Sequence, residues 1–225
     1  MMTRTEAFQA FGKNIARPKA LQEMFEAGSL KPKKGERRGS GKPTKQENEL
    51  IRASVIVTIG ALDAYLSDVA AEVLIAQLGT MQPRTDQARS LLRRVLKELD
   101  TLPLELVLLS SQDDRETVIG DALRDHLTNK VSNLGAKGVV TTVERMGAQF
   151  DWTRLETKIP KSLALSGDPK SPASVLDAWT TRRHALVHQG RALRIRISRA
   201  RALVEFVETI VAEVDRIAVK AISAA

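Results

Sequence analysis

Hydrophobic residues recur along the chain at the three- and four-residue spacing of amphipathic helices. The clearest case covers residues 197–222, where one face carries Leu203, Phe206, Ile210, Val214, Ile217 and Ala221. A second stripe over residues 45–78 contains Ile51, Val55, Ile59, Leu62, Leu66, Val69 and Val73, and Thr44 is placed to cap that helix. Alternation of the strand type is confined to residues 193–197. The pattern therefore predicts an all-α fold, a helical bundle with long antiparallel helices.

Shorter helices are predicted between and beside the two long ones. Ser171 and Pro172 suit the start of a helix that runs to about residue 189, and Gly190 suits its end. Residues 129–160 are interpreted as short helices joined by Gly135 and Gly138. The remaining predicted helices cover residues 5–12, 18–28, 85–98, 103–110 and 113–128. We expect an N-terminal helical segment with a basic loop over residues 1–44 and one helical domain over residues 45–225.

The loop at residues 31–43 is rich in Gly, Pro and cations and lies between two predicted helices. It resembles a phosphate loop only superficially, because Glu36 stands where that motif needs Gly and Pro43 where it needs Ser or Thr. Its cations are either an RNA-binding arm or a solubilising linker, and the interpretation as an RNA-binding arm is slightly favoured. The candidate RNA-binding residues here are Lys33, Lys34, Arg37 and Arg38.

The charge of the chain is concentrated in two places. Of a net +8 over 225 residues, residues 1–45 carry 11 Lys or Arg against 4 Glu, a net charge of +7. Residues 179–204 contain seven Arg and no acid, among them Arg182, Arg191 and Arg194 as candidate RNA contacts. Such clusters suit a phosphate-rich partner, although charge runs are as often simply solvated.

Cysteine is absent, which excludes disulfides and thiolate metal sites. The N-terminus shows no signal-peptide pattern, and the uninterrupted apolar runs are shorter than a membrane span. We therefore expect a soluble cytoplasmic protein that needs no membrane.

Two of the three histidines lie in one predicted helix, together with an arginine on an apolar line. His184 and His188 are one turn apart and share a face. Arg183 lies on a different face of the helix, in line with the apolar residues Leu176 and Trp179. A guanidinium at such a position needs a carboxylate, a neighbouring subunit or a phosphate as its partner. Cleavage of RNA through the 2′-hydroxyl needs an imidazole that exchanges protons and a fixed positive charge on the phosphate, and it requires no metal and no cofactor.

The segment Arg183-His184-Ala-Leu-Val-His188 resembles the Arg-polar-x-x-x-His motif of the HEPN superfamily, helical domains rich in metal-independent ribonucleases. The long helix containing residues 61–69 and the final helix with Glu213 and Asp215 are similar to those that flank the motif in HEPN domains. The nearest group is identified as RiboL-PSP-HEPN or a related prokaryotic one, over roughly residues 45–220.

The resemblance implies roles for individual residues and for partners. Arg183 and His188 would be the catalytic pair, His184 the polar motif residue, and Asp63 or Asp68 supporting carboxylates. It also implies a homodimer with a shared cleft, RNA as substrate, a toxin or antiphage setting, and an antitoxin or other defence-system protein as partner. One departure is Gly190, which stands where some HEPN toxins carry a tyrosine that a partner enzyme modifies.

Other interpretations remain open at the level of sequence. The main alternative is a non-catalytic HEPN module that binds RNA, a nucleotide or a partner protein. A DNA-binding regulator is weaker, because no helix-turn-helix pattern stands out. His184 and His188 also have zinc-pair spacing, but Asp, Glu or the distant His126 would have to complete the site. His126 itself is expected on the surface.

Overall fold

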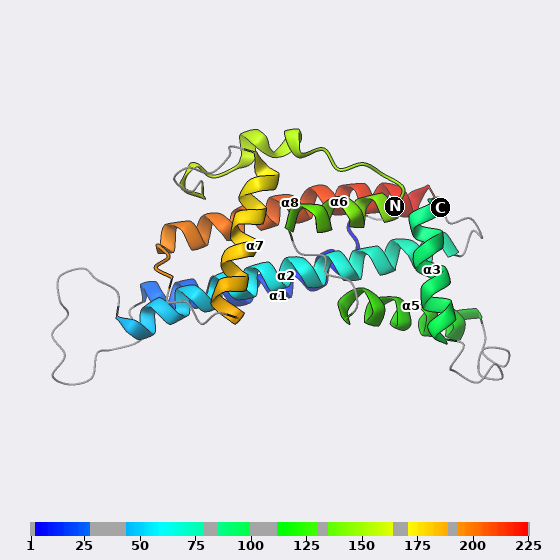
Figure 1. Ribbon diagram of the computed structural model, residues 1–225, viewed down its shortest axis with the longest axis horizontal. Helices are drawn as coiled ribbons and strands as arrows, with labels where there is room; N and C mark the ends of the chain where they lie inside the picture. Colours follow the sequence, from blue (N-terminus) through cyan, green and yellow to red (C-terminus); the bar gives the residue numbers. More distant parts are fainter. Residues whose placement is uncertain are drawn as a thin grey trace. The chain divides into compact units, whose positions relative to one another are not determined.

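The computed structural model describes residues 3–27, 44–78, 85–99, 112–129, 135–163, 171–188 and 193–224. Every regular element in these ranges is a helix, and none is a strand, which confirms the all-α prediction (Figure 1). The predicted helix at residues 103–110 lies outside the described residues. The α-helices are α1 (Glu6–Glu26), α2 (Lys45–Leu78), α3 (Asp86–Leu99), α5 (Gln112–Asn129), α6 (Gly135–Arg145), α7 (Pro172–His188) and α8 (Ile197–Ser223), and the 3-10 helices are η1 (Trp152–Lys158) and η2 (Lys161–Leu163).

Thr44 caps the start of α2, as the sequence predicted, and Glu47 completes a capping box. The Thr44 hydroxyl accepts a hydrogen bond from the backbone N–H of Glu47 at 3.1 Å, and the Glu47 carboxylate accepts one from the N–H of Thr44 at 2.7 Å. All seven residues of the predicted apolar stripe of α2 are buried. The stripe of α8 is buried as well, except that Ala221 is partly exposed.

Helix α2 also has the length and apolar composition of a membrane-spanning segment. An 18-residue window within Lys45–Gln77 has a mean hydropathy of 1.5, and 56% of that window is buried inside the structure. Counting uninterrupted apolar runs missed this window, because averaging tolerates isolated charges such as Asp63. The core helix of a soluble protein passes the same test, so this feature is weak evidence for a membrane.

The chain forms two compact units. The first contains residues 1–10, 63–151 and 211–225, and the second contains residues 11–62 and 152–210. The core of the first unit is built where α3 and α5 pack together with the C-terminal half of α2. Its buried members are Ala70, Ala71, Leu74, Ala88, Leu91, Leu92, Val95, Leu123 and Leu127.

In the first unit, two carboxylates hold the N-terminus of α1. The two oxygens of Glu72 accept hydrogen bonds from the backbone N–H groups of Glu6 and Ala7 at 3.1 and 3.0 Å. Asp215, only 1% exposed, accepts bonds from the hydroxyl and N–H of Thr5 and pairs with Arg4 at 3.1 Å. Negative charge at this end complements both the unpaired N–H groups and the helix dipole.

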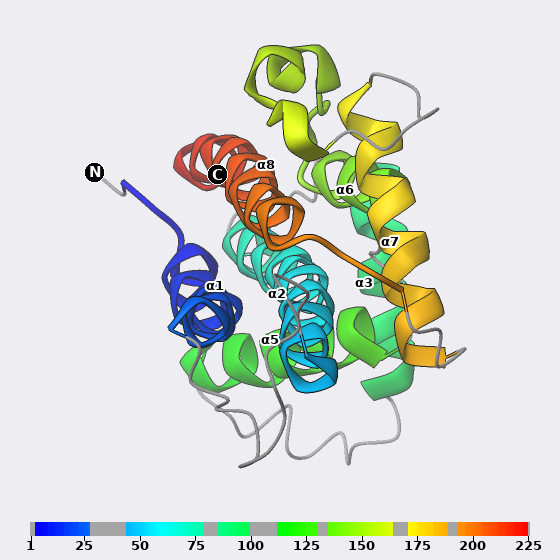
Figure 2. The same cartoon turned by 90° about the vertical axis from the view of Figure 1, so that its left-hand side faces the viewer.

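In the second unit, α1 runs antiparallel to α2, and the Gln22 amide donates a hydrogen bond to the Ser54 hydroxyl at 2.7 Å. Figure 2 shows residues 193–196 as an extended segment leading into α8. The Arg52 side chain holds this segment, because its Nε donates to the carbonyl of Leu193 at 3.0 Å. Trp179 and Phe206 are fully buried and anchor the core of this unit.

Two details of the predicted helices were wrong. Residues 5–12 and 18–28 form one helix, α1, which continues through Pro18. Pro18 removes a backbone donor, but it is buried on the same face as Phe11, Ile15 and Gln22, and that packing favours an uninterrupted helix.

Gly138 does not join two helices but lies on the buried face of α6. The backbone reversal after α6 occurs instead at Gly147, where φ is 83°.

Candidate active site

Helix α7 carries the motif, and its first half has a capped N-terminus and a buried apolar face. The Ser171 hydroxyl accepts a hydrogen bond from the Ser174 N–H at 3.3 Å, and Pro172 occupies the first helical position, as predicted. Val175, Leu176 and Trp179 bury one face, and α7 packs against η1. The second half of the helix, from residue 180 to His188, contains no fully buried residue. The first half of α7 is therefore anchored by buried side chains, and the more exposed second half bears the charged groups.

Arg183 is a half-buried cation in the second half of α7. Its Nε is inaccessible to solvent and has no hydrogen-bond partner among the described residues. The same holds for Trp179 Nε1 and Thr180 Oγ1, so three such atoms lie within five residues of α7. Unsatisfied buried polar groups are rare in folded proteins and each disfavours the folded state.

The two histidines of the motif form an exposed pair. The ring centroids of His184 and His188 are 4.6 Å apart, with the rings tilted by 42°. Both side chains are exposed, in the last turn and a half of α7. Imidazoles so placed are accessible to a substrate in solution.

Arg183 and His188 do not form a pair with each other. Five residues of helix separate them by about 140° around the axis and about 7.5 Å along it. Within the described structure no hydrogen bond joins the two side chains. The expected closeness of these two groups is therefore not provided by direct contact within one chain, and a ligand or a second copy of α7 would have to bridge them.

The neighbouring Arg182 stacks on the core. Its guanidinium lies 5.3 Å from the ring centroid of Trp179, a cation–π geometry. Arg194, also a candidate RNA contact, is exposed in the segment after α7. The other candidates, Arg191, Lys33, Lys34, Arg37 and Arg38, and with them the helix-ending Gly190, lie outside the described residues.

The supporting carboxylates Asp63 and Asp68 belong to the first unit, whereas the motif belongs to the second. Both are half-buried rather than fully exposed. Burial raises the pKa of Asp68, and the charge of Arg124 opposes that rise. Their predicted action on the motif stays a prediction.

His126 is not on the surface. It is 6% exposed on α5, because α5 turns this face towards the core that also contains Leu123 and Leu127. The charged neighbour Asp125 suggested solvent, but at helical spacing adjacent residues point in different directions. In the part of the chain that the structure describes, no three His, Asp or Glu side chains gather as metal ligands.

Two features of the structure were missed from the sequence. Arg52 fixes the segment after the motif, but its acceptor lies 141 positions away, so no local signal announces the contact. The cations of α3 recur at helical spacing and could have been found by projecting their charges on a helix.

The model of one family matches residues 26–220 of the chain, and its description is RiboL-PSP-HEPN. The chain belongs to the RiboL-PSP-HEPN family. The match covers most of the chain and includes α7 with the whole Arg183-to-His188 segment. Membership confirms the resemblance seen in the sequence and points to a nuclease or RNA-related role in general. No curated protein and no solved structure is similar enough to this chain to count as a match.

Proposed function

We propose that this HEPN domain is a metal-independent endoribonuclease whose active site is the second half of α7. The observation that supports this most directly concerns the half-buried Arg183, whose Nε has no hydrogen-bond partner among the described residues and which shares the second half of α7 with the exposed His184–His188 pair. A phosphodiester would supply an anionic acceptor for the Nε of Arg183, and the imidazoles would take up and donate protons.

The reaction follows from these two kinds of group. His188 takes the proton of the ribose 2′-hydroxyl, and the 2′-oxygen attacks the adjacent phosphorus. The bond from phosphorus to the 5′-oxygen breaks, and that oxygen leaves with a proton donated by an imidazole. The products are a 2′,3′-cyclic phosphate and a 5′-hydroxyl end. Arg183 stabilises the negative charge that develops on the non-bridging phosphate oxygens, and His184 positions the substrate or His188.

A homodimer with a shared cleft would complete the site. One chain leaves Arg183 and His188 on different sides of the helix, and two copies of α7 facing each other would surround one phosphate with both groups. Val187, next to His188, is 43% exposed and would lie within such an interface. The setting that accords with the family likeness is a cytoplasmic toxin or antiphage effector restrained by an antitoxin or another defence-system protein.

Substitution of the two central residues tests the proposal. In a cleavage assay on single-stranded RNA with EDTA present, His188→Ala should lower the rate by about 10²- to 10⁴-fold. Arg183→Ala should lower it by roughly 10²- to 10³-fold, and Arg183→Lys should restore it only in part. Lys13→Ala, an exposed charge on α1, is the matched control and should retain the rate. Circular dichroism checks that each variant folds.

Three outcomes would contradict the proposal. Wild-type activity in His188→Ala would exclude the imidazole, and activity that EDTA abolishes would exclude the metal-free mechanism. If the wild-type chain binds varied RNAs without cleaving any of them, the chain is instead a non-catalytic HEPN module.

A further inference from the structure

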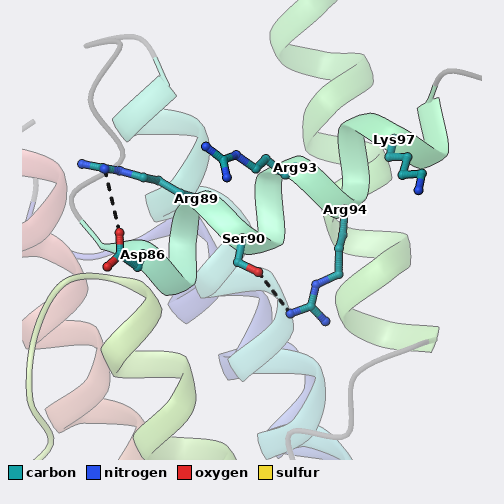
Figure 3. Close-up of a pocket in the computed structure, with 6 residues that line it drawn as sticks. All are labelled: Asp86, Arg89, Ser90, Arg93, Arg94 and Lys97. Carbon is teal, nitrogen blue, oxygen red and sulfur yellow. Dashed lines mark hydrogen bonds and ion pairs between the residues drawn. The ribbon is translucent and has the colours of Figure 1, made fainter.

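Helix α3 presents a strongly basic surface that the proposed active site does not use. Its inner face is buried in the core of the first unit through Ala88, Leu91, Leu92 and Val95. Its outer face carries Arg89, Arg93, Arg94 and Lys97, all exposed, which we call the α3 basic face. In Figure 3, Arg89 and Arg93 extend from one side of the helix, Ser90 and Arg94 from another, and Lys97 lies near its C-terminal end.

The charge of the α3 basic face is poorly neutralised. Among the described residues that line the same groove, Asp86 is the one acid, and its fully exposed carboxylate is 3.8 Å from Arg89. Within the described part of the chain, Arg94 donates a hydrogen bond to the neutral hydroxyl of Ser90, at 3.3 Å. Neither Arg93 nor Lys97 forms an ion pair with another described residue. The described residues of this groove therefore carry four cations against one acid, a net charge of +3, and Arg93, Arg94 and Lys97 are exposed outside the Asp86–Arg89 pair.

A second element adds to this concentration of charge. Helix α6 packs against α3, and Arg145 at its end is half-buried. The pKa of Arg145 is lowered by burial and also by the positive charge of Arg94. The two guanidinium groups therefore lie close enough to repel each other, and an anion bound near Arg94 would relieve that repulsion.

The shape of the surface suits an extended polyanion rather than a small enclosed ligand. The α3 residues line an open groove of about 440 Å³. Arg89, Arg93 and Lys97 follow one another at four-residue spacing over about 12 Å of helix. That length matches a few successive phosphates of a nucleic acid strand, and guanidinium groups bind phosphate in a forked geometry.

We propose that the α3 basic face binds the sugar–phosphate backbone of RNA, as a contact separate from the cleavage motif. A membrane surface is less suitable, because a helix that lies on lipid needs an exposed apolar face and that of α3 is buried in the core. Aromatic residues are absent from α3, so the contact reads phosphates and not bases. The choice of RNA over DNA rests on the proposed function, whereas binding at α3 does not require cleavage.

The test compares two matched double variants. Arg93→Ala/Lys97→Ala removes one Arg and one Lys four residues apart from α3, and Lys13→Ala/Arg17→Ala removes the same pair of side chains from the exposed face of α1. The probe is a fluorescent 2′-O-methyl RNA, which cannot be cleaved through its 2′-oxygen. Binding is measured by anisotropy over a range of salt concentrations, with single-stranded DNA and vesicles of phosphatidylserine and phosphatidylcholine as parallel probes.

The α3 variant should bind the RNA about tenfold or more weakly. The negative slope of log affinity against log salt should become shallower by about 1.4, the value for two single-strand phosphate contacts. The α1 variant should change neither quantity by a comparable amount. Equal loss in both variants, no loss in the α3 variant, or a larger effect on vesicles than on RNA would overturn the inference. The probe cannot be cleaved, so binding is measured independently of cleavage. If the wild-type protein cleaves no RNA but the binding pattern holds, the ribonuclease proposal is refuted and the α3 contact stands.

Discussion

Tyr65 is the only tyrosine of the chain, and it is 1% exposed on α2. Its hydroxyl lies 3.4 Å from the carbonyl of Val211, the acceptor for a weak hydrogen bond. Burial raises its pKa well above the ordinary value, and the carboxylates of Asp215 and Glu72 raise it further, while Arg4 opposes them. A buried phenol beside two acids stays protonated because its anion would be both desolvated and repelled.

This residue provides a spectroscopic test of the packing in the first unit. In an alkaline titration, the phenolate absorbance should not appear near pH 10, the usual range of tyrosine, but only together with unfolding. The Tyr65 phenol loses its proton at lower pH in the unfolded chain than in the folded one. The free energy of unfolding therefore falls as pH rises above about 10. A reversible phenolate signal near pH 10 in a fully helical protein would contradict the buried environment.

Asp68 provides the corresponding test for a carboxylate. Its folded pKa is raised chiefly by burial, so the charged form destabilises the folded state once pH exceeds the ordinary aspartate range. We expect Asp68→Asn to become progressively more stable than the wild type as pH rises from about 4 towards neutrality in urea denaturation. In carboxyl NMR titrations, Arg124→Ala should raise the pKa of Asp68 further, since Arg124 opposes the shift. A pKa for Asp68 at or below the ordinary value would remove the basis of this expectation.

At the scale of the element, the capping box of α2 is the local signal with the clearest energetic consequence. Thr44 satisfies the N–H of Glu47, and Glu47 in turn satisfies the N–H of Thr44. Thr44→Ala removes the first of these bonds and should lower the free energy of unfolding by about 1 kcal/mol. Thr44→Ser keeps the hydroxyl and should retain most of that stability. Urea denaturation followed by circular dichroism measures both variants, and equal destabilisation by Ala and Ser would show that the hydroxyl is not the cause.

At the scale of the whole molecule, the proposed dimer makes activity depend on assembly. Val187 is 43% exposed beside the motif, whereas Val118 on α5 is 40% exposed and far from it in sequence. If the motif lies in a shared cleft, Val187→Asp should lower the dimer fraction in sedimentation velocity and reduce RNA cleavage in parallel. Val118→Asp introduces the same charge at a similar exposure and should affect neither. A Val187→Asp protein that stays dimeric and fully active would exclude an interface at this end of α7.

Local sequence patterns determined the helical class and singled out the candidate site residues. Apolar periodicity placed α2 and α8 nearly to the residue, Thr44 marked a helix start, and Ser171-Pro172 marked the start of the motif helix. The Arg183-to-His188 spacing gave the family, which the match over residues 26–220 confirms. These features could be read because each depends on residues within a few positions of one another, where helix geometry fixes their relation.

Tertiary structure alone decided the features that join distant positions. It buried His126, continued α1 through Pro18, and brought Asp215 to Thr5 and Arg52 to Leu193. It also left the Nε of Arg183 without a hydrogen-bond partner among the described residues, while the charge of Arg94 on α3 acts on Arg145 of α6. Burial and ion pairing depend on which surfaces pack together, and periodicity along one helix states which face is apolar but not what covers it.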